Sequence, residues 1–306
     1  MKDPHRSYHE GEMAVQSRAG VGKDGLCADE MYRPTMGAGV ARFLAAQHIC
    51  VLSTMDGEGR VWASMRSGQA GFIRAADETT VEIGGYGHRD DPLLTNLITR
   101  SAAGMLVIHL AARHRVRLNG DATANGDGQI RLQVNQVYGN CPQYIQAREV
   151  QGLRQPVSSP GRKAEKLDER TRKWVETADT FFLATAHLQS GMDASHRGGR
   201  PGFVRVENES RLLFPDYPGN RMFNSLGNIS AYPNAGLLFV DFQSAAGLQL
   251  SGTASILWDN PQMTDFPGAQ RMVALDIERI LELPQATLLQ FEFRNYSPNL
   301  RMMPVT

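Results

Sequence analysis

The chain lacks a charge excess of either sign and any long hydrophobic run. Its 306 residues include 32 lysines and arginines against 32 aspartates and glutamates, so the formal net charge is zero. A protein that binds nucleic acid usually carries a basic excess, and that class is therefore disfavoured. The N-terminus "MKDPHRSYHEGE" is polar and no apolar run is long enough to span a bilayer, which predicts neither a membrane span nor a secretory signal. We expect a cytoplasmic protein with no membrane partner.

Cysteine is scarce as well, which argues against a disulfide framework. The three cysteines, Cys27, Cys50 and Cys141, are odd in number and widely spaced, with no CxxC pair. The run "HEGE" at positions 9–12 lacks the second histidine of the HExxH zinc motif. The sequence therefore predicts no metal site. Cys50, inside the apolar run "ICVLST", is expected to be buried as a small hydrophobic residue.

The chain does contain a repeat of itself. The stretch "ASMRSGQAGFIR", residues 63–74, matches "ASHRGGRPGFVR", residues 194–205, at a lag of 131 with seven identities in twelve positions. The match continues at a lag of 132, where "AGMLVIHL" aligns with "AGLLFVDF" and Gly120 with Gly252. This period is far longer than the ~20–50 residues of solenoid repeats, so it indicates a duplicated domain.

Each copy is predicted to consist mainly of β-strands. Apolar runs such as "ICVLST" and "TFFLATA" are bounded by polar turns, and "NGDG" at 125–128 is a strong hairpin signal. A closed antiparallel barrel of six or seven strands with one or two short helices accounts for each half. The predicted fold is mainly β (α+β): two tandem split β-barrels that form a pseudo-dimer within one chain. We expect an N-terminal arm at 1–38, a first barrel at 39–150, a linker at 151–170 and a second barrel at 171–306.

Only a few repeated residues are neither apolar nor typical of turns. They are the pairs Ser64/Ser195, Arg66/Arg197 and Arg89/Arg221, with the glycines around them. Glycines beside a strand let a ligand approach the backbone closely. Two arginines that converge can bind one anion. The repeated set therefore predicts an anion site in at least one copy.

The second copy is better suited to an anion than the first. In "FPDYPGNRMFNSLGNI" Arg221 and Ser225 stand at the start of a predicted helix, whose free amides favour phosphate. The first copy has Leu93 where the second has Ser225, and it adds Asp90 and Asp91, which would oppose a phosphate. We therefore expect one ligand per chain, held in the second copy.

The second copy also resembles a known family. "DASHRGGRPGFVRV" and "LLFPDYPGNRMFNSLGNISAYPNAGLLFVDF" resemble the FMN-binding split barrels related to pyridoxamine 5′-phosphate oxidase, within their tandem-barrel branch. "YHEGEMAVQSRAGV" and "YGNCPQYIQAR" resemble that branch too, so the likeness covers most of the chain. The resemblance implies that FMN lies at the interface of two barrels. The oxidase itself has a lysine-bearing motif where this chain has "FVRV", so oxidation of pyridoxamine phosphate does not carry over.

Carried over residue by residue, the resemblance implies a set of cofactor-binding positions in the second copy. They are Ser195, His196, Arg197 and Gly198 on one strand, Pro215, Asp216 and Tyr217 where another strand passes the ring, Asn220, Arg221 and Ser225 at the phosphate, and Gln249 toward the pyrimidine side. No residue is assigned a catalytic role.

The family favours an FMN-dependent oxidoreductase that acts on a small-molecule substrate or electron donor. The alternative is a non-catalytic protein that binds or senses a flavin, a deazaflavin or haem. The segment "YGNCPQYIQ", residues 138–146, either packs against the end of the first barrel or closes the flavin pocket. The tandem chain could also pair as a homodimer.

Overall fold

The computed structural model describes residues 8–21 and 31–302, so part of the expected N-terminal arm, including Cys27, lies outside the described residues. Within these ranges no helix is long and apolar enough to cross a membrane. The helices are α1 (Glu10–Arg18), α3 (Ala38–Ala45), α4 (Leu93–Thr99), α5 (Glu169–Thr177) and α6 (Asn224–Ala231), with the 3-10 helices η1 (Pro261–Asp265) and η2 (Pro298–Met302).

Strands dominate both halves of the chain, as the apolar runs predicted. The first half contains β1 (Ile49–Met55), β2 (Val61–Ser67), β3 (Ile73–Ala75), β4 (Thr80–Ile83), β5 (Ala102–His109), β6 (His114–Ala124), β7 (Ile130–Gly139) and β8 (Ala147–Leu153). The second half contains β9 (Arg162–Ala164), β10 (Thr180–His187), β11 (Gly191–Gly198), β12 (Arg205–Asn208), β13 (Arg211–Asp216), β14 (Asn234–Val240), β15 (Gly247–Leu257), β16 (Arg271–Leu283) and β17 (Leu289–Asn295).

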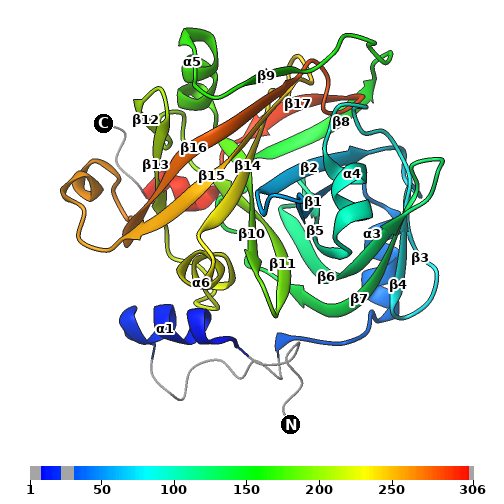
Figure 1. Ribbon diagram of the computed structural model, residues 1–306, viewed down its shortest axis with the longest axis horizontal. Helices are drawn as coiled ribbons and strands as arrows, with labels where there is room; N and C mark the ends of the chain where they lie inside the picture. Colours follow the sequence, from blue (N-terminus) through cyan, green and yellow to red (C-terminus); the bar gives the residue numbers. More distant parts are fainter. Residues whose placement is uncertain (1–7, 22–30, 303–306) are drawn as a thin grey trace.

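The two halves form antiparallel sheets with the same strand order (Figure 1). The first sheet runs β2-β1-β5-β6-β7-β4-β3 and the second runs β11-β10-β14-β15-β16-β13-β12, with β9 added beside β16. A β-bulge lies at Asn119/Gly120 in the first half and at Ser251/Gly252 in the second, at the repeat lag of 132. Glycine is required at both bulges, because a Cβ atom would stand 1.9 Å from the carbonyl oxygen of Gln133 or 2.0 Å from that of Asp276.

The expected closure of each half into a barrel is confirmed only in part: in the first half an isolated β-bridge joins Ser67, at the end of β2, to Tyr86, which follows β4. Among the described strands no ladder joins the end strands β2 and β3, or β11 and β12. The reason is that β2 and β11 pack against the other half instead: β2 contacts β14 and β11 contacts β5. Apart from the Ser67–Tyr86 bridge, the ladders between the described strands leave each sheet open at the edge that meets the other half.

The interface between the halves has a hydrophobic core of its own. One apolar cluster lies within each half, and a third combines buried residues of both, including Val51 and Leu106 from the first half with Phe182 and Leu238 from the second. Two glycines at the repeat lag set the separation of the halves. A Cβ atom on Gly104 would lie 2.6 Å from the Met192 carbonyl oxygen, and one on Gly236 would lie 2.4 Å from that of Val61.

Segments outside the sheets connect the halves further. β8 pairs with β17 in a separate two-stranded ribbon, so the ends of the two halves meet. The segment expected to be a linker contains β9, which pairs with β16, and α5 begins at its end. At the other side of the molecule α1 packs on α6 of the second half (Figure 1).

Replacing Gly236 with alanine should destabilise the chain strongly. The added methyl group would meet the backbone of β2, which cannot move without disturbing the interface, and overpacking of this kind costs roughly 1–3 kcal/mol. Gly39→Ala is the matched control, because nothing lies within 4 Å of a Cβ at this helical position. It should be neutral or stabilise by roughly 0.5–1 kcal/mol. Urea unfolding of both variants measures the difference, and equal stability would show that the halves tolerate a wider separation.

Candidate functional site

A cleft opens between the two halves beside the start of α6, and we call it the interface cleft. The first half lines it with Arg115 and Arg117 of β6 and with Asn140, Cys141, Gln143 and Tyr144 of the segment that follows β7. The second half lines it with His196, Arg197 and Gly198 of β11, with Pro215 and Asp216 of β13, and with most of residues 217–226. The cleft contains a cavity of about 110 Å³ and is open to solvent at its mouth.

The structure brings most of the predicted cofactor residues together in this cleft. The predicted residues that line it are His196, Arg197, Gly198, Pro215, Asp216, Tyr217, Asn220, Arg221 and Ser225. Ser195 lies one layer behind, fully buried, where its hydroxyl donates to the Leu183 carbonyl and accepts from Ser225 at 3.1 Å. Ser195 and His196 point away from each other, as expected for neighbours on a strand.

Gln249 is not part of the interface cleft, contrary to its predicted place. Its amide nitrogen donates to the Ala63 carbonyl oxygen at 2.8 Å and to the Asp91 carboxylate at 2.8 Å. Both partners belong to the first half. The physical reason is the packing of the halves, because Gln249 lies before the bulge of β15, and β15 contacts β2 of the opposite half.

The sequence did not predict Arg115 and Arg117, which line the cleft from the first half. Arg117 is the counterpart of Gln249 at the lag of 132, and it crosses in the other direction to bind Asp193 of β11 at 2.8 Å. Arg115 lies two residues earlier on the same face of β6. The sequence repeat could have identified both residues, if β6 had been assigned to the site of the second copy.

The cleft carries an excess of positive charge. Four arginines line it, Arg115, Arg117, Arg197 and Arg221, against the single carboxylate of Asp216. Arg197 pairs with Asp216 at 2.7 Å, and Arg221 has no ion pair among the described residues. Within the part of the chain that the structure describes, Arg115 donates to backbone carbonyls only, those of Cys141 at 2.7 Å and His196 at 3.3 Å. Burial, with Arg117 and Arg197 nearby, lowers the pKa of Arg115 to about 9.

His196 is a buried imidazole among these cations. Only 4% of the residue is exposed, and neither ring nitrogen has a hydrogen-bond partner within the described residues. Burial lowers the pKa of His196 well below its usual value, and Arg115, Arg148 and Arg197 lower it further. The ring is therefore neutral and offers one donor and one acceptor. Unsatisfied buried groups of this kind are uncommon in folded proteins, so the ring is available to bind a ligand or an ordered water.

The first half closes one side of the cleft through the segment that follows β7. Cys141 and Tyr144 line the cleft, and the Tyr144 ring lies 5.2 Å from that of Tyr217. Tyr138 is instead buried behind it, where its hydroxyl donates to Asp193 at 2.7 Å. Of the two interpretations of "YGNCPQYIQ", the structure thus supports closure of the cleft for residues 141–144 and packing for Tyr138.

The turn before α6 is held in a strained conformation. Arg221 and Phe223 have φ of 60° and 59°, in the left-handed region that side chains other than glycine rarely adopt. The turn leads directly into Asn224 and Ser225, so the free amides of the α6 N-terminus and the Arg221 side chain border the same space. Strain at such a point is typical of a binding site held in place by its surroundings.

The counterpart of this site in the first half is filled by the protein itself. Arg66, the counterpart of Arg197, donates to the carbonyls of Gly84, Gly85 and Gly128. Arg89, the counterpart of Arg221, donates to the Ser158 carbonyl at 2.9 Å. The segment before β9 therefore covers the turn that would receive a ligand.

Asp91 is half-buried at the same place in the first half. It accepts from the Leu93 amide and from Gln249, and burial raises its pKa to about 6. Asp90 accepts from the Gly161 amide at 2.8 Å. Both carboxyl groups serve contacts within the protein, consistent with the expectation that this copy does not receive an anion.

Comparison with known families gives a match in the second half of the chain. The family model described as pyridoxamine 5′-phosphate oxidase matches residues 167–298, which include β11, β13 and α6. This match covers less than half of the chain and lies in its second half. The resemblance inferred from "DASHRGGRPGFVRV" is thereby confirmed, and we call residues 167–298 the oxidase-family half.

Solved structures similar to this chain match about two fifths of it. HupZ of Group A Streptococcus is 14% identical, with 39% of this chain and 94% of that chain covered and a TM-score of 0.31. General Stress Protein 26 of Bacillus anthracis is 14% identical, with 39% and 92% covered and a TM-score of 0.29. An FAD binding protein of Mycobacterium smegmatis is 15% identical, with 39% and 96% covered and a TM-score of 0.26. A search of curated proteins found no match.

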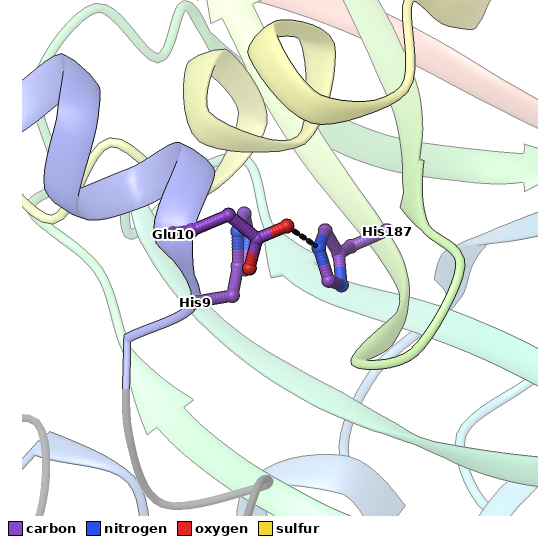
Figure 2. A group of neighbouring side chains, drawn as sticks. All are labelled: His9, Glu10 and His187. Carbon is purple, nitrogen blue, oxygen red and sulfur yellow. Dashed lines mark hydrogen bonds and ion pairs between the residues drawn. The ribbon is translucent and has the colours of Figure 1, made fainter.

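The described residues contain one group with the composition of a metal site, at the contact of α1 with the oxidase-family half. His9, Glu10 and His187 place potential ligand atoms within 4.8 Å of one another (Figure 2). The second histidine, which "HEGE" lacks, thus comes from β10. The two imidazole rings are stacked, with centroids 4.0 Å apart and planes 18° apart.

The hydrogen bonds of the two rings argue against metal binding. The Nδ1 atom of His9 accepts from the Gly11 amide, and that of His187 accepts from the Ser190 amide. Each neutral ring must then carry its proton on Nε2, which donates to Asn228 in one case and to Glu10 in the other. A ligating histidine does the reverse, since it binds through a bare nitrogen and donates from the other. We call these three residues the histidine clasp.

Acidification should weaken the clasp at His9. Burial and the neighbouring His187 lower the pKa of His9 from 6.5 to about 4, so the folded state takes up the proton less readily than the unfolded chain. The contribution of His9 to the free energy of unfolding should therefore be fully present above pH 6.5. It should fall by roughly 1–3 kcal/mol between pH 6.5 and pH 4. His9→Asn keeps a side-chain acceptor at the helix N-cap but does not titrate.

Unfolding by urea at pH 7.5 and at pH 4.5 tests this expectation. The wild-type chain should lose more stability than His9→Asn over this interval, and the two should differ little at pH 7.5. Equal losses would show that His9 does not take up a proton on unfolding.

Proposed function

We propose that the chain binds one FMN in the interface cleft and is an FMN-dependent oxidoreductase that acts on a small-molecule substrate. The observation that carries this proposal is a cleft lined by four arginines, of which Arg115 and Arg221 have no ion pair within the described residues, beside the N-terminus of α6 and a neutral His196. Arg117 and Arg197 are ion-paired with Asp193 and Asp216. Such a set fits a phosphate together with a polar, uncharged group. The match of the second half to the pyridoxamine 5′-phosphate oxidase family supports a flavin as that ligand.

FMN fits this donor set better than FAD. Arg221, Arg197 and the α6 amides form one compact anion site. The Nε atoms of Arg115 and Arg117 also lack partners within the described residues. No separate nucleotide site is evident in the cleft lining, so one phosphate accounts for the cations present. When bound, a flavin would supply the hydride or electron transfer.

The chain's own residues would bind and orient the cofactor. Arg221 and the α6 N-terminus hold the phosphate, while Tyr144 and Tyr217, one from each half, limit the space at the mouth. His196 can donate from one ring nitrogen and accept at the other. It does not serve as a cationic acid at neutral pH, because its pKa is lowered. Asp216 is held by ion pairs with Arg197 and Arg271, which leaves it poorly placed to transfer a proton.

We also propose that the two sheets are tandem split barrels that form a pseudo-dimer, in which one of two related sites has been lost. The identical strand order, the paired bulges and the reciprocal glycine contacts support this interpretation. The segment over Arg89 and the bonds made by Arg66 leave the first copy as a wall of the site in the second. The expected occupancy is one FMN per chain.

A second candidate is a flavin carrier or sensor without catalysis. It is favoured by the state of the two titratable groups in the cleft, since His196 is neutral and Asp216 is ion-paired. The visible spectrum separates the candidates. Bleaching of the bound flavin by NAD(P)H or a candidate amine supports the enzyme, and bleaching by dithionite alone supports the carrier.

Titration with FMN tests the proposed site. The wild-type chain should bind one equivalent of FMN. Arg221→Ala should raise the dissociation constant by roughly 10–100-fold, because a charge-assisted hydrogen bond contributes about 1.5–3 kcal/mol. Arg89→Ala is the matched control at the repeat-related position, and it should leave the dissociation constant unchanged. Mass spectrometry of the chromophore should identify FMN.

Three results would contradict the proposal. Binding of two equivalents would show that the first copy also holds a cofactor. An equal loss of FMN affinity in Arg89→Ala and Arg221→Ala would remove the distinction between the copies. Failure of the wild-type chain to bind FMN would exclude the assignment altogether.

A further inference from the structure

Helix α1 contacts the strained turn of the interface cleft through a buried side chain. Gln16 donates from Nε2 to the carbonyl oxygen of Met222 at 3.1 Å, and only 9% of Gln16 is exposed. Met222 stands between Arg221 and Phe223, the two residues with left-handed φ. The bond therefore fixes the peptide at the centre of the turn that carries Arg221.

A second side chain of α1 holds the first residue of α6. Glu12 accepts from the Asn224 amide nitrogen at 2.6 Å and from the Tyr32 hydroxyl at 3.1 Å. Asn224 lines the interface cleft. Glu12 is itself buried, with 4% exposed, and its other oxygen accepts from the His9 amide. Two consecutive turns of α1 thus contact both ends of the segment from Met222 to Asn224.

The position of α1 is set by a contact between backbones. A Cβ atom on Gly11 would lie 2.3 Å from the Gly227 carbonyl oxygen, and one on Gly227 would lie 2.6 Å from Cα of Glu12. Glycine at both positions lets α1 and α6 approach this closely, so that Glu12 and Gln16 reach the turn. The histidine clasp anchors the start of α1 to β10 and, through Asn228, to α6.

The strained turn needs such a support. Left-handed residues other than glycine cost of order 1–3 kcal/mol each and persist only where the surroundings determine them. Within the turn, the side-chain oxygen of Asn220 accepts a hydrogen bond from the Met222 amide at 3.2 Å, and few other hydrogen bonds hold the turn. Arg271 of β16 stacks on the Phe223 ring, and Tyr32 and Tyr138 pack with Met222. Gln16 adds a hydrogen bond from another element to the backbone of the turn.

We propose that α1 is a brace for the anion-binding turn, with Gln16 and Glu12 as positioning residues and the histidine clasp as its anchor. The inference rests on the proposed FMN site, since it assigns to α1 the task of shaping the part that holds the phosphate. Neither residue lines the interface cleft. Their effect on the ligand would pass through Met222 and Asn224.

Comparison of FMN with riboflavin isolates this effect, because the two share the ring and differ in the phosphate. Gln16→Met keeps length and burial but cannot donate to the Met222 carbonyl. FMN should bind it about tenfold more weakly, the equivalent of one hydrogen bond, with riboflavin binding unchanged. His187→Ala, which loosens the anchor, should lower the same FMN-to-riboflavin preference. Ser17→Ala, at an exposed position of the same helix, should behave as wild type.

Hydrogen exchange of the full chain without cofactor provides a second measurement. Amides of residues 220–226 should exchange about tenfold faster in Gln16→Met than in wild type, with Ser17→Ala unchanged. Faster exchange with an unaltered FMN-to-riboflavin preference would overturn the positioning role, and unaltered exchange would overturn the brace itself. A wild-type chain without preference for FMN would contradict the proposed function, while the exchange data would still decide whether α1 holds the turn.

Discussion

The reciprocal backbone contact between the halves is the constraint that shapes the site. Gly104 lies against β11 and Gly236 against β2, at distances that no side chain could share. This contact brings β6 of the first half to the edge of β11, and it places Arg115 and Arg117 beside a cleft whose turn and helix belong to the second half. Neither half alone contains the full set of cations. The cleft therefore depends on the pairing of the two sheets as much as on any residue within it.

If the two halves were identical, the same geometry would produce two equivalent sites. The differences between the halves explain why the two sites are not equivalent. Where β6 sends Arg117 to Asp193, β15 sends Gln249 to Asp91. Where the second half leaves Arg221 without an ion pair, the first ties Arg89 to the segment before β9. In the first half, Asp91 and the segment before β9 thus occupy the space that stays open in the second half. Under the proposed function, this filling leaves one ligand site in the second half and makes the first half a wall of that site.

Much of this could be predicted from the sequence, because the signals were local. The repeat lag indicated the duplication, and "FPDYPGNRMFNSLGNI" predicted the turn and the start of α6, where Arg221 and Ser225 line the cleft. Other features depend on how elements pack. The burial of Ser195, the absence of Gln249 from the cleft and the presence of Arg115 all follow from which half each strand faces. The contact of α1 with the turn could not be predicted, since Gln16 and Met222 are 206 positions apart.

The central claim is that residues of both halves form one anion site at the α6 N-terminus. A crystal structure of the chain grown with FMN tests it most directly. The account predicts phosphate density at the Arg221 turn, within hydrogen-bond distance of Arg197 or Arg115, and no flavin density beside Arg66 and Arg89. Density at the first-half turn, or a phosphate bound away from α6, would contradict the account.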